Sequence, residues 1–166
     1  MLDLPTLSSN GIILKPLMLT HANDLTRACQ DGELWKINVT SVPEPDKVID
    51  YINTAASMAD RKAFVVIDKL NGKAIGSTSF HDILPNSKRL EIGYTWYAKS
   101  YWRTDIDNHR SQQAIERLGA KKDGVIRGNR VRRDGVISDT VMYSMSKDEW
   151  PKHKTKLIEK LAKHGK

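Results

Sequence analysis

The sequence contains very little cysteine and no long apolar segment. Cys29 is its only cysteine, which excludes an internal disulfide framework, and no Cys/His cluster has the spacing of a zinc site. No apolar run approaches the ~20 residues of a membrane-spanning helix. Residues 1–10 lack the basic and apolar regions of a signal peptide. We therefore expect a cytoplasmic protein with no metal site and no membrane partner.

What is present is an ordinary folded composition with an excess of positive charge. Hydrophobic residues make up 39% and charged residues 28%, which argues against a disordered chain. The length predicts one domain over residues 1–166, with residues 1–10 as an N-terminal extension and 147–166 as a basic C-terminal helix. The net charge of +7 is concentrated in residues 121–133 and 147–166. Such clusters are most often solvated faces, although they also attract nucleic acid or anionic cofactors.

The hydrophobic pattern alternates between strand and helix periodicity in the first half of the chain. Thr20 is a plausible N-cap for a helix that buries Leu25, Ala28 and Cys29. Val48, Ile52, Ala55 and Ala59 follow helical spacing over residues 45–60. Strands are expected at residues 12–17, 63–68, 74–84 and 89–97, the middle two forming a hairpin around Asn71-Gly72.

The second half continues with a helix, a hairpin and a helix. Asn108 begins a helix that Gly119 ends. Residues 121–132 and 136–145 are predicted to pair as strands, and Pro151 precedes the last helix. The expected fold class is α/β in an α+β layered form, with a mixed, largely antiparallel sheet flanked by helices.

Several short stretches, in this order, resemble the GNAT acyltransferase family and its ribosomal-protein-alanine (RimJ/RimL-type) N-acetyltransferase branch. Each is weak alone, and together they cover about residues 11 to 151. They are Thr40–Pro45 (TSVPEP), Gly76–Thr78 (GST), Glu91–Tyr97 (EIGYTWY), Tyr101–Thr104 (YWRT), Asn108–Ser111 (NHRS), Ala114–Ala120 (AIERLGA), Asp139–Val141 (DTV) and Glu149–Pro151 (EWP).

The resemblance implies an acetyl-CoA-dependent N-acetyltransferase whose acceptor is a primary amine such as a protein N-terminus. In that family the pantetheine arm lies along the first of two splayed parallel strands, and the pyrophosphate meets a glycine-rich turn that opens a helix. The implied catalytic residues are Ser111, as donor to the departing thiolate, and Asn108. Glu33 and Trp35 lie where the family forms its acceptor side. The implied cofactor-binding residues are Tyr94, Thr95, Trp96, Tyr97, Arg103, Thr104 and Asn108.

The sequence departs from this family at the phosphate-binding turn. It contains no Gly-x-Gly, and Asp105 follows Arg103-Thr104 where the pattern has glycine. A parallel strand pair needs a crossover of roughly a dozen residues, and only ten residues separate Tyr97 from Asn108. We therefore expect a fold that lacks one helix and one strand through an internal deletion. The sheet then either closes against the final hairpin, recruits a strand from a second copy as a homodimer, or swaps its C-terminal half.

The candidate residues also have structural readings. Asn108 and Ser111 fit an N-capping arrangement, an exposed Glu33 is usually just solvated, and Arg103 is able to cap a strand end. His81 is expected to lie on the sheet surface rather than to act as a base. The alternation of residues 89–97 does not show whether the Glu91 side chain is buried near the thioester. Cys29 is expected in the helix core.

Three functions therefore stay open. The first is acetyl transfer to an amine. The second is a catalytically impaired GNAT-derived variant with weak or no acetyl-CoA binding, because a lost phosphate cradle removes several charge-assisted hydrogen bonds. The third is a basic RNA- or ribosome-binding module, which ranks last because no aromatic stacking platform accompanies the basic residues.

Overall fold

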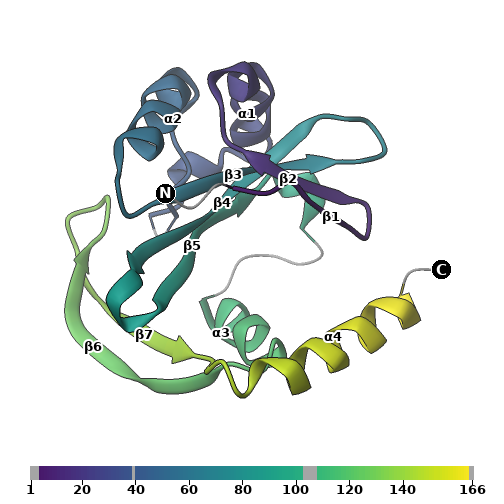
Figure 1. Ribbon diagram of the computed structural model, residues 1–166. Helices are drawn as coiled ribbons and strands as arrows, with labels where there is room; N and C mark the ends of the chain where they lie inside the picture. The colour runs from purple at the N-terminus through teal and green to yellow at the C-terminus, as the bar shows by residue number, and fades with distance from the viewer. Residues whose placement is uncertain (1–3, 39, 103–107, 165–166) are drawn as a thin grey trace. The chain divides into compact units, whose positions relative to one another are not determined.

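Five antiparallel strands form the sheet of the first part of the chain. The computed structural model describes residues 4–38, 40–102 and 108–164, and the chain folds as two units, Met1–Arg103 and Thr104–Lys166. The first unit contains β1 (Leu7–Ser9), β2 (Ile12–Pro16), β3 (Lys62–Asp68), β4 (Ala74–Leu84) and β5 (Arg89–Tyr97). They lie side by side in chain order, each antiparallel to the next. This arrangement confirms the predicted layered fold with an antiparallel sheet (Figure 1).

Helices α1 (Ala22–Gln30) and α2 (Val48–Ser57) cover one face of this sheet (Figure 1). As predicted, α1 buries Leu25, Ala28 and Cys29, and the cluster continues into β3 and β5. Full burial of such side chains contributes roughly 1.5–3 kcal/mol each for the larger ones. This hydrophobic cluster fixes both helices over β3, β4 and β5.

Two details of these helices differ from the prediction. Thr20 is not the N-cap of α1, because residues Leu19–His21 form a short 3-10 turn and His21 precedes the helix. Ala59 is exposed, because α2 ends at Ser57. In both places a local turn replaces the periodic pattern at the end of a helix, where periodicity is least informative.

The N-terminal residues contribute a strand that the pattern did not reveal. Leu7–Ser9 pairs with β2 through the two-residue turn Asn10-Gly11, and both turn residues have positive φ, 44° and 80°. Asn-Gly is the preferred dipeptide for this tight hairpin turn. The signal was therefore in the sequence, at the end of the segment assigned to an N-terminal extension.

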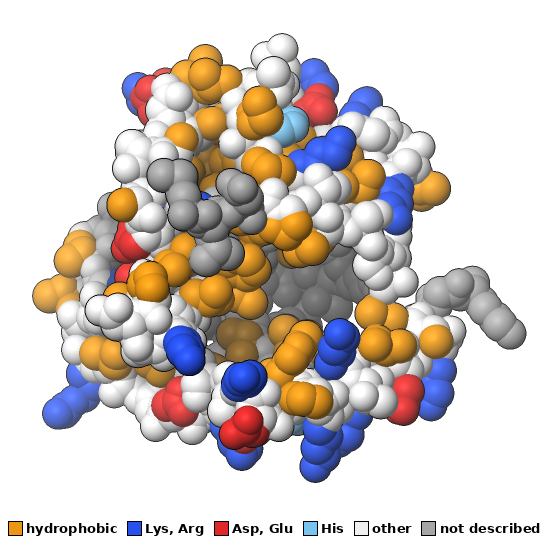
Figure 2. Space-filling view, viewed as in Figure 1, with side chains coloured by type: hydrophobic (Ala, Val, Ile, Leu, Met, Phe, Trp, Pro, Cys, Tyr) orange, Lys and Arg blue, Asp and Glu red, His pale blue; other side chains and the backbone are white. Residues whose placement is uncertain are grey.

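The second unit contains α3 (Asn108–Arg117), β6 (Lys121–Val131), β7 (Ile137–Ser144) and α4 (Trp150–His164). Strands β6 and β7 form an antiparallel two-stranded sheet, as predicted for this hairpin. Gly119 follows α3 at φ +101°, the left-handed conformation expected of a helix-ending glycine. Lysine and arginine side chains gather over α4 on the face shown in Figure 2. Among the described residues, no helix is both long and apolar enough to cross a membrane.

Cys29 is fully buried, and its thiol donates to the carbonyl of Thr26 at 3.1 Å. Burial raises the pKa of the Cys29 thiol from 9.0 to about 11. A two-unit rise lowers the thiolate fraction at pH 8 about a hundredfold. We expect negligible labelling of the native protein by a thiol reagent at pH 8 and stoichiometric labelling in denaturant. Rapid labelling without denaturant would show that Cys29 is accessible.

Candidate active site

Strand β5 departs from regular pleating at Tyr94. Ser77 pairs with Trp96 whereas Ser79 pairs with Gly93, so β5 holds one extra residue between these pairs. Tyr94 takes up the extra length at φ +50°, in the left-handed region. A tyrosine there costs of the order of 1 kcal/mol or more, so its surroundings must hold it in place. The β-bulge therefore marks a constrained point on β5.

The bulge also changes which side chains share a face. Regular alternation along β5 predicts that Leu90, Ile92, Tyr94 and Trp96 share one face of the sheet, and that prediction is wrong. Ile92 is 72% exposed, whereas Trp96 is 4% exposed and packs edge-on against Tyr51 of α2, with ring centroids 6.4 Å apart. One inserted residue reverses the alternation beyond it.

A buried arginine lies against the bulge. Arg61 precedes β3, is only 3% exposed, and holds its guanidinium carbon 3.7 Å from the centroid of the Tyr94 ring. Its Nε donates to Ser79 Oγ and its Nη2 to the Tyr51 hydroxyl, both at 3.0 Å. No carboxylate among the described residues forms an ion pair with it. The positive charge of Arg61 is therefore stabilised by the faces of aromatic rings and by hydrogen bonds to hydroxyl groups.

Tyr51 links the arginine to the rest of the strand pair. Its hydroxyl donates to Ser77 Oγ at 3.2 Å, and Trp96 Nε1 donates to the same hydroxyl at 3.4 Å. Ser77 Oγ in turn donates to the carbonyl of Phe64 on β3 at 3.0 Å. Buried polar groups joined in this way are satisfied and rigid. The network holds β3, β4, β5 and α2 together around the bulge.

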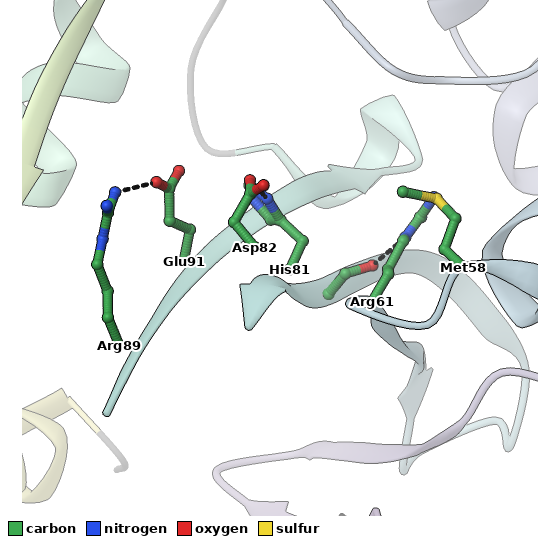
Figure 3. A network of polar contacts seen from close by, with 7 residues as sticks. Met58, Arg61, His81, Asp82, Arg89 and Glu91 are labelled. Atoms are coloured by element: carbon green, nitrogen blue, oxygen red, sulfur yellow. Dashed lines mark hydrogen bonds and ion pairs between the residues drawn. The ribbon is translucent and has the colours of Figure 1, made fainter. Parts of the chain in front are cut away.

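A second polar group lies next to the bulge, at the start of β5 (Figure 3). His81 is 7% exposed, contrary to the expectation of a sheet-surface residue, and its ring packs edge-on to Tyr94 at 5.1 Å. Its Nδ1 lies 2.6 Å from Asp82 Oδ2. Glu91 pairs with His81 across the strands and forms an ion pair with Arg89.

Asp82 reaches the same side as His81 because its backbone is left-handed, with φ +46°. Consecutive residues of a regular strand point to opposite faces. The ligand-type atoms of His81, Asp82 and Glu91 all lie within 4.8 Å of one another. Such a spacing admits a cation, but each of these groups already has a protein partner.

The other residues implied by the resemblance are distributed over both units. Thr95 bonds the Thr78 hydroxyl at 2.7 Å, and Tyr97 accepts a hydrogen bond from Trp102 Nε1 at its carbonyl, at 2.8 Å. Glu33 is exposed and paired with Lys36 at 2.6 Å, as its solvated reading predicted. Trp35 packs against the hydrophobic core of the first unit.

Some of these positions lie in or next to the gap in the described residues. Arg103 and Thr104 lie outside the described residues. Asn108 is the first residue of α3, and Ser111 is exposed on the same helix. The roles of these four residues stay predictions.

Sequence reasoning missed Tyr51, Arg61 and Asp82 as site residues. One signal was available, because Ser77, Ser79 and His81 alternate along β4 and so share one face. Polar residues on a buried face require partners. Nothing in the local pattern identifies Arg61 or Tyr51 as those partners.

Comparisons with known proteins identify the family and the fold of this chain. A family model described as an acetyltransferase (GNAT) domain matches residues 12–106. No curated protein matches the sequence. Among solved structures, one from T. thermophilus, provisionally described as an acetyltransferase, is 26% identical with a TM-score of 0.80, covering 97% of this chain and 100% of the other.

Two further solved structures resemble this chain in fold. A GCN5-related N-acetyltransferase from Brucella melitensis is 22% identical with a TM-score of 0.80, covering 95% of this chain and 85% of that one. RimL, the ribosomal L7/L12 alpha-N-protein acetyltransferase in complex with coenzyme A, is 15% identical with a TM-score of 0.67 over 81% of this chain and 93% of its own.

Proposed function

The chain belongs to the GNAT acetyltransferase family, and on this premise we propose that it transfers an acetyl group from acetyl-CoA to a primary amine. The observation that carries the proposal is the bulged strand β5, which ends the five-stranded sheet and lies inside the family match. In the described residues β5 pairs only with β4, so its outer edge offers unpaired backbone groups. Such an edge suits the amide-rich pantetheine arm.

The reaction proceeds by direct attack of the amine nitrogen on the thioester carbonyl. Backbone N–H groups at the bulge are suited to stabilise the oxyanion, because a bulge leaves its extra residue outside the ladder. Tyr94, Thr95, Trp96 and Tyr97 line the donor, and Asn108 holds the pantetheine region. Ser111 donates to the departing thiolate.

The remaining roles lie at the two ends of the donor and on the acceptor. Arg103 and Thr104 contact the phosphates, and Glu33 and Trp35 flank the acceptor, whose class includes protein N-termini. In the alternative in which the chain forms a homodimer, a strand of the second copy takes the free edge of β5 in place of the pantetheine arm. Sedimentation velocity at low and high concentration tests that expectation.

We further propose that the grip on the nucleotide part of acetyl-CoA is reduced, because the glycine-rich turn and its helix are deleted. Only ten residues separate Tyr97 from Asn108, and the sequence has no Gly-x-Gly. Each lost charge-assisted hydrogen bond is worth about 1.5–3 kcal/mol. The competing proposal is an RNA- or ribosome-binding module that uses the basic residues of 121–133 and 147–166, for which salt-dependent binding of RNA fragments is the test.

Calorimetric titration with acetyl-CoA and with S-acetylpantetheine tests the donor and the deletion together. We expect both to bind with dissociation constants within about threefold of each other, because the nucleotide adds little without its cradle. Sequencing of the gene across Thr104-Asp105, together with an intact-mass measurement, shows whether the segment is absent from the titrated protein. Binding of acetyl-CoA at micromolar or tighter affinity, with S-acetylpantetheine a hundredfold weaker, would contradict the reduced grip. Absence of binding by both would contradict acetyl transfer itself.

A further inference from the structure

Acetyl transfer to an amine requires a group that takes a proton from the attacking nitrogen. A protonated amine has no lone pair with which to attack the thioester. Three proton-accepting side chains lie beside the bulge of β5, namely those of His81, Asp82 and Glu91. They differ in how each is already bound, and that difference separates their roles.

Glu91 is the least suited of the three. Its carboxylate is held by Arg89 in an ion pair (Figure 3). A carboxylate that is neutralised by an arginine is a weaker proton acceptor, because protonation would break the pair. Asp82 is engaged with His81, and its side chain is 58% exposed. The imidazole of His81 is therefore the remaining acceptor beside Tyr94.

The two ring nitrogens of His81 have different surroundings. Nδ1 lies 2.6 Å from Asp82 Oδ2, so the carboxylate favours the tautomer that carries its proton on Nδ1. The lone pair of the neutral ring is then on Nε2. Nε2 lies directly over Gly93, where a Cβ atom would overlap it and approach Cδ2 to 3.0 Å. The basic nitrogen therefore lies against β5, one residue before the bulge.

The charges that face His81 come from several elements. Asp82 on β4 and Glu91 on β5 favour a charged imidazolium, Arg89 offsets Glu91, and Arg61 opposes the imidazolium from beyond the Tyr94 ring. Tyr94 contacts both Arg61 and His81, so the ring separates the two cations. Asp82 is the unneutralised anion in direct contact, and it stabilises the imidazolium as it forms.

We propose that His81 is the general base of the acetyl transfer and that Asp82 is its positioning residue, an inference that rests on the proposed function. The amine loses its ammonium proton to solvent before it attacks, and as the C–N bond forms the nitrogen gives one further proton to His81 Nε2. The tetrahedral intermediate then breaks its C–S bond, and the imidazolium returns that proton to the departing thiolate through water. The products are the acetamide and coenzyme A, and His81 ends neutral.

The test measures thiol release from acetyl-CoA by the whole chain between pH 5.5 and 9.5. The acceptors are peptides that begin with alanine or serine, and water alone, because attack by water needs the same proton removal. We expect His81→Gln to lower kcat by about 10²–10⁴-fold. Its residual rate should rise about tenfold per pH unit, without the inflection that the wild-type profile shows. Acetyl-CoA binding, measured by calorimetry, should stay within about threefold.

Asp82→Asn provides a second variant. Position 82 tolerates this substitution because the Asp82 side chain is largely exposed. It should lower kcat about tenfold, since the imidazolium that forms during the reaction loses its anion, and should leave acetyl-CoA binding within about threefold. His21→Gln, a histidine on the 3-10 turn before α1, is the matched control and should keep the wild-type profile.

Each outcome decides between the proposals. Rates and pH profiles of His81→Gln and Asp82→Asn within about twofold of wild type would overturn the role of His81 while acetyl transfer stands. If acetyl-CoA binds but none of the acceptors causes release of the thiol, the role of His81 is overturned as well. A wild-type chain that neither binds nor consumes acetyl-CoA would overturn the proposed function. If His81→Gln fails to fold, the kcat of Asp82→Asn alone decides.

Discussion

The Gly76→Ala variant is expected to lose about 4 kcal/mol or more of the free energy of unfolding of the first unit. Gly76 lies in β4 opposite Tyr97 of β5. A Cβ atom at this position would overlap the carbonyl oxygen of Trp96 and lie 2.9 Å from Cα of Tyr97. These are backbone atoms, so no rotamer change relieves the clash and the two strands must separate. The bulge and the buried network depend on that pairing.

Urea unfolding followed by tryptophan fluorescence measures this loss, because Trp96 is buried against Tyr51. Gly124→Ala is the matched control, since Gly124 lies in β6 with nothing within 4 Å of its added methyl group. That substitution should change the stability by less than about 1 kcal/mol in either direction. Equal unfolding midpoints for the two variants would show that β4 and β5 are further apart at Gly76 than the structure indicates.

The Arg61→Ala variant is expected to destabilise the first unit by about 3 kcal/mol and also to lower the rate of acetyl transfer. It removes a buried cation, leaves the hydroxyls of Ser79 and Tyr51 without their donor, and opens a cavity. Each unsatisfied buried hydroxyl costs about 1–3 kcal/mol, and a desolvated cation–π contact contributes about 2 kcal/mol. Tyr94 then loses the stacked guanidinium that holds its left-handed backbone.

Arg61→Met separates packing from charge. Methionine refills much of the volume, and a buried cation replaced by an apolar side chain often costs little stability. We expect a smaller loss, of about 1–2 kcal/mol, with acetyl transfer still impaired because Tyr94 is no longer stacked. Arg27→Met, on the exposed face of α1, is the control and should leave both quantities unchanged. Full activity of Arg61→Met would mean that Tyr94 holds its conformation without the cation.

Local pattern accounts for most elements of this fold. The bounds of β4 and β5 were predicted to the residue, as was the buried face of α1, because strands and helices with one buried face leave a regular apolar period. Hairpins announced by Asn-Gly at residues 71–72 and by Asp-Gly at 134–135 also form. The same dipeptide at Asn10-Gly11 did not predict a hairpin, because the residues before it have no apolar period.

The candidate site was less predictable, since its members come from distant segments. Tyr51 lies in α2, Arg61 directly before β3, His81 in β4 and Tyr94 in β5, and no spacing rule relates these residues. The bulge is equally hidden, because the residues of β5 alternate acceptably in either register. A one-residue insertion is chosen by the pairing of two strands and not by either strand alone.

The sequence by itself determined the family, the order of the elements and the absence of a glycine-rich turn, since each of these is written in contiguous residues. Only the tertiary structure decided that Tyr94 is left-handed, that Arg61 is buried with no carboxylate partner in the part of the chain that is described, and that Asp82 turns to join His81. These features exist because separate segments share a small buried volume, where every polar group must find a partner whatever its distance along the chain.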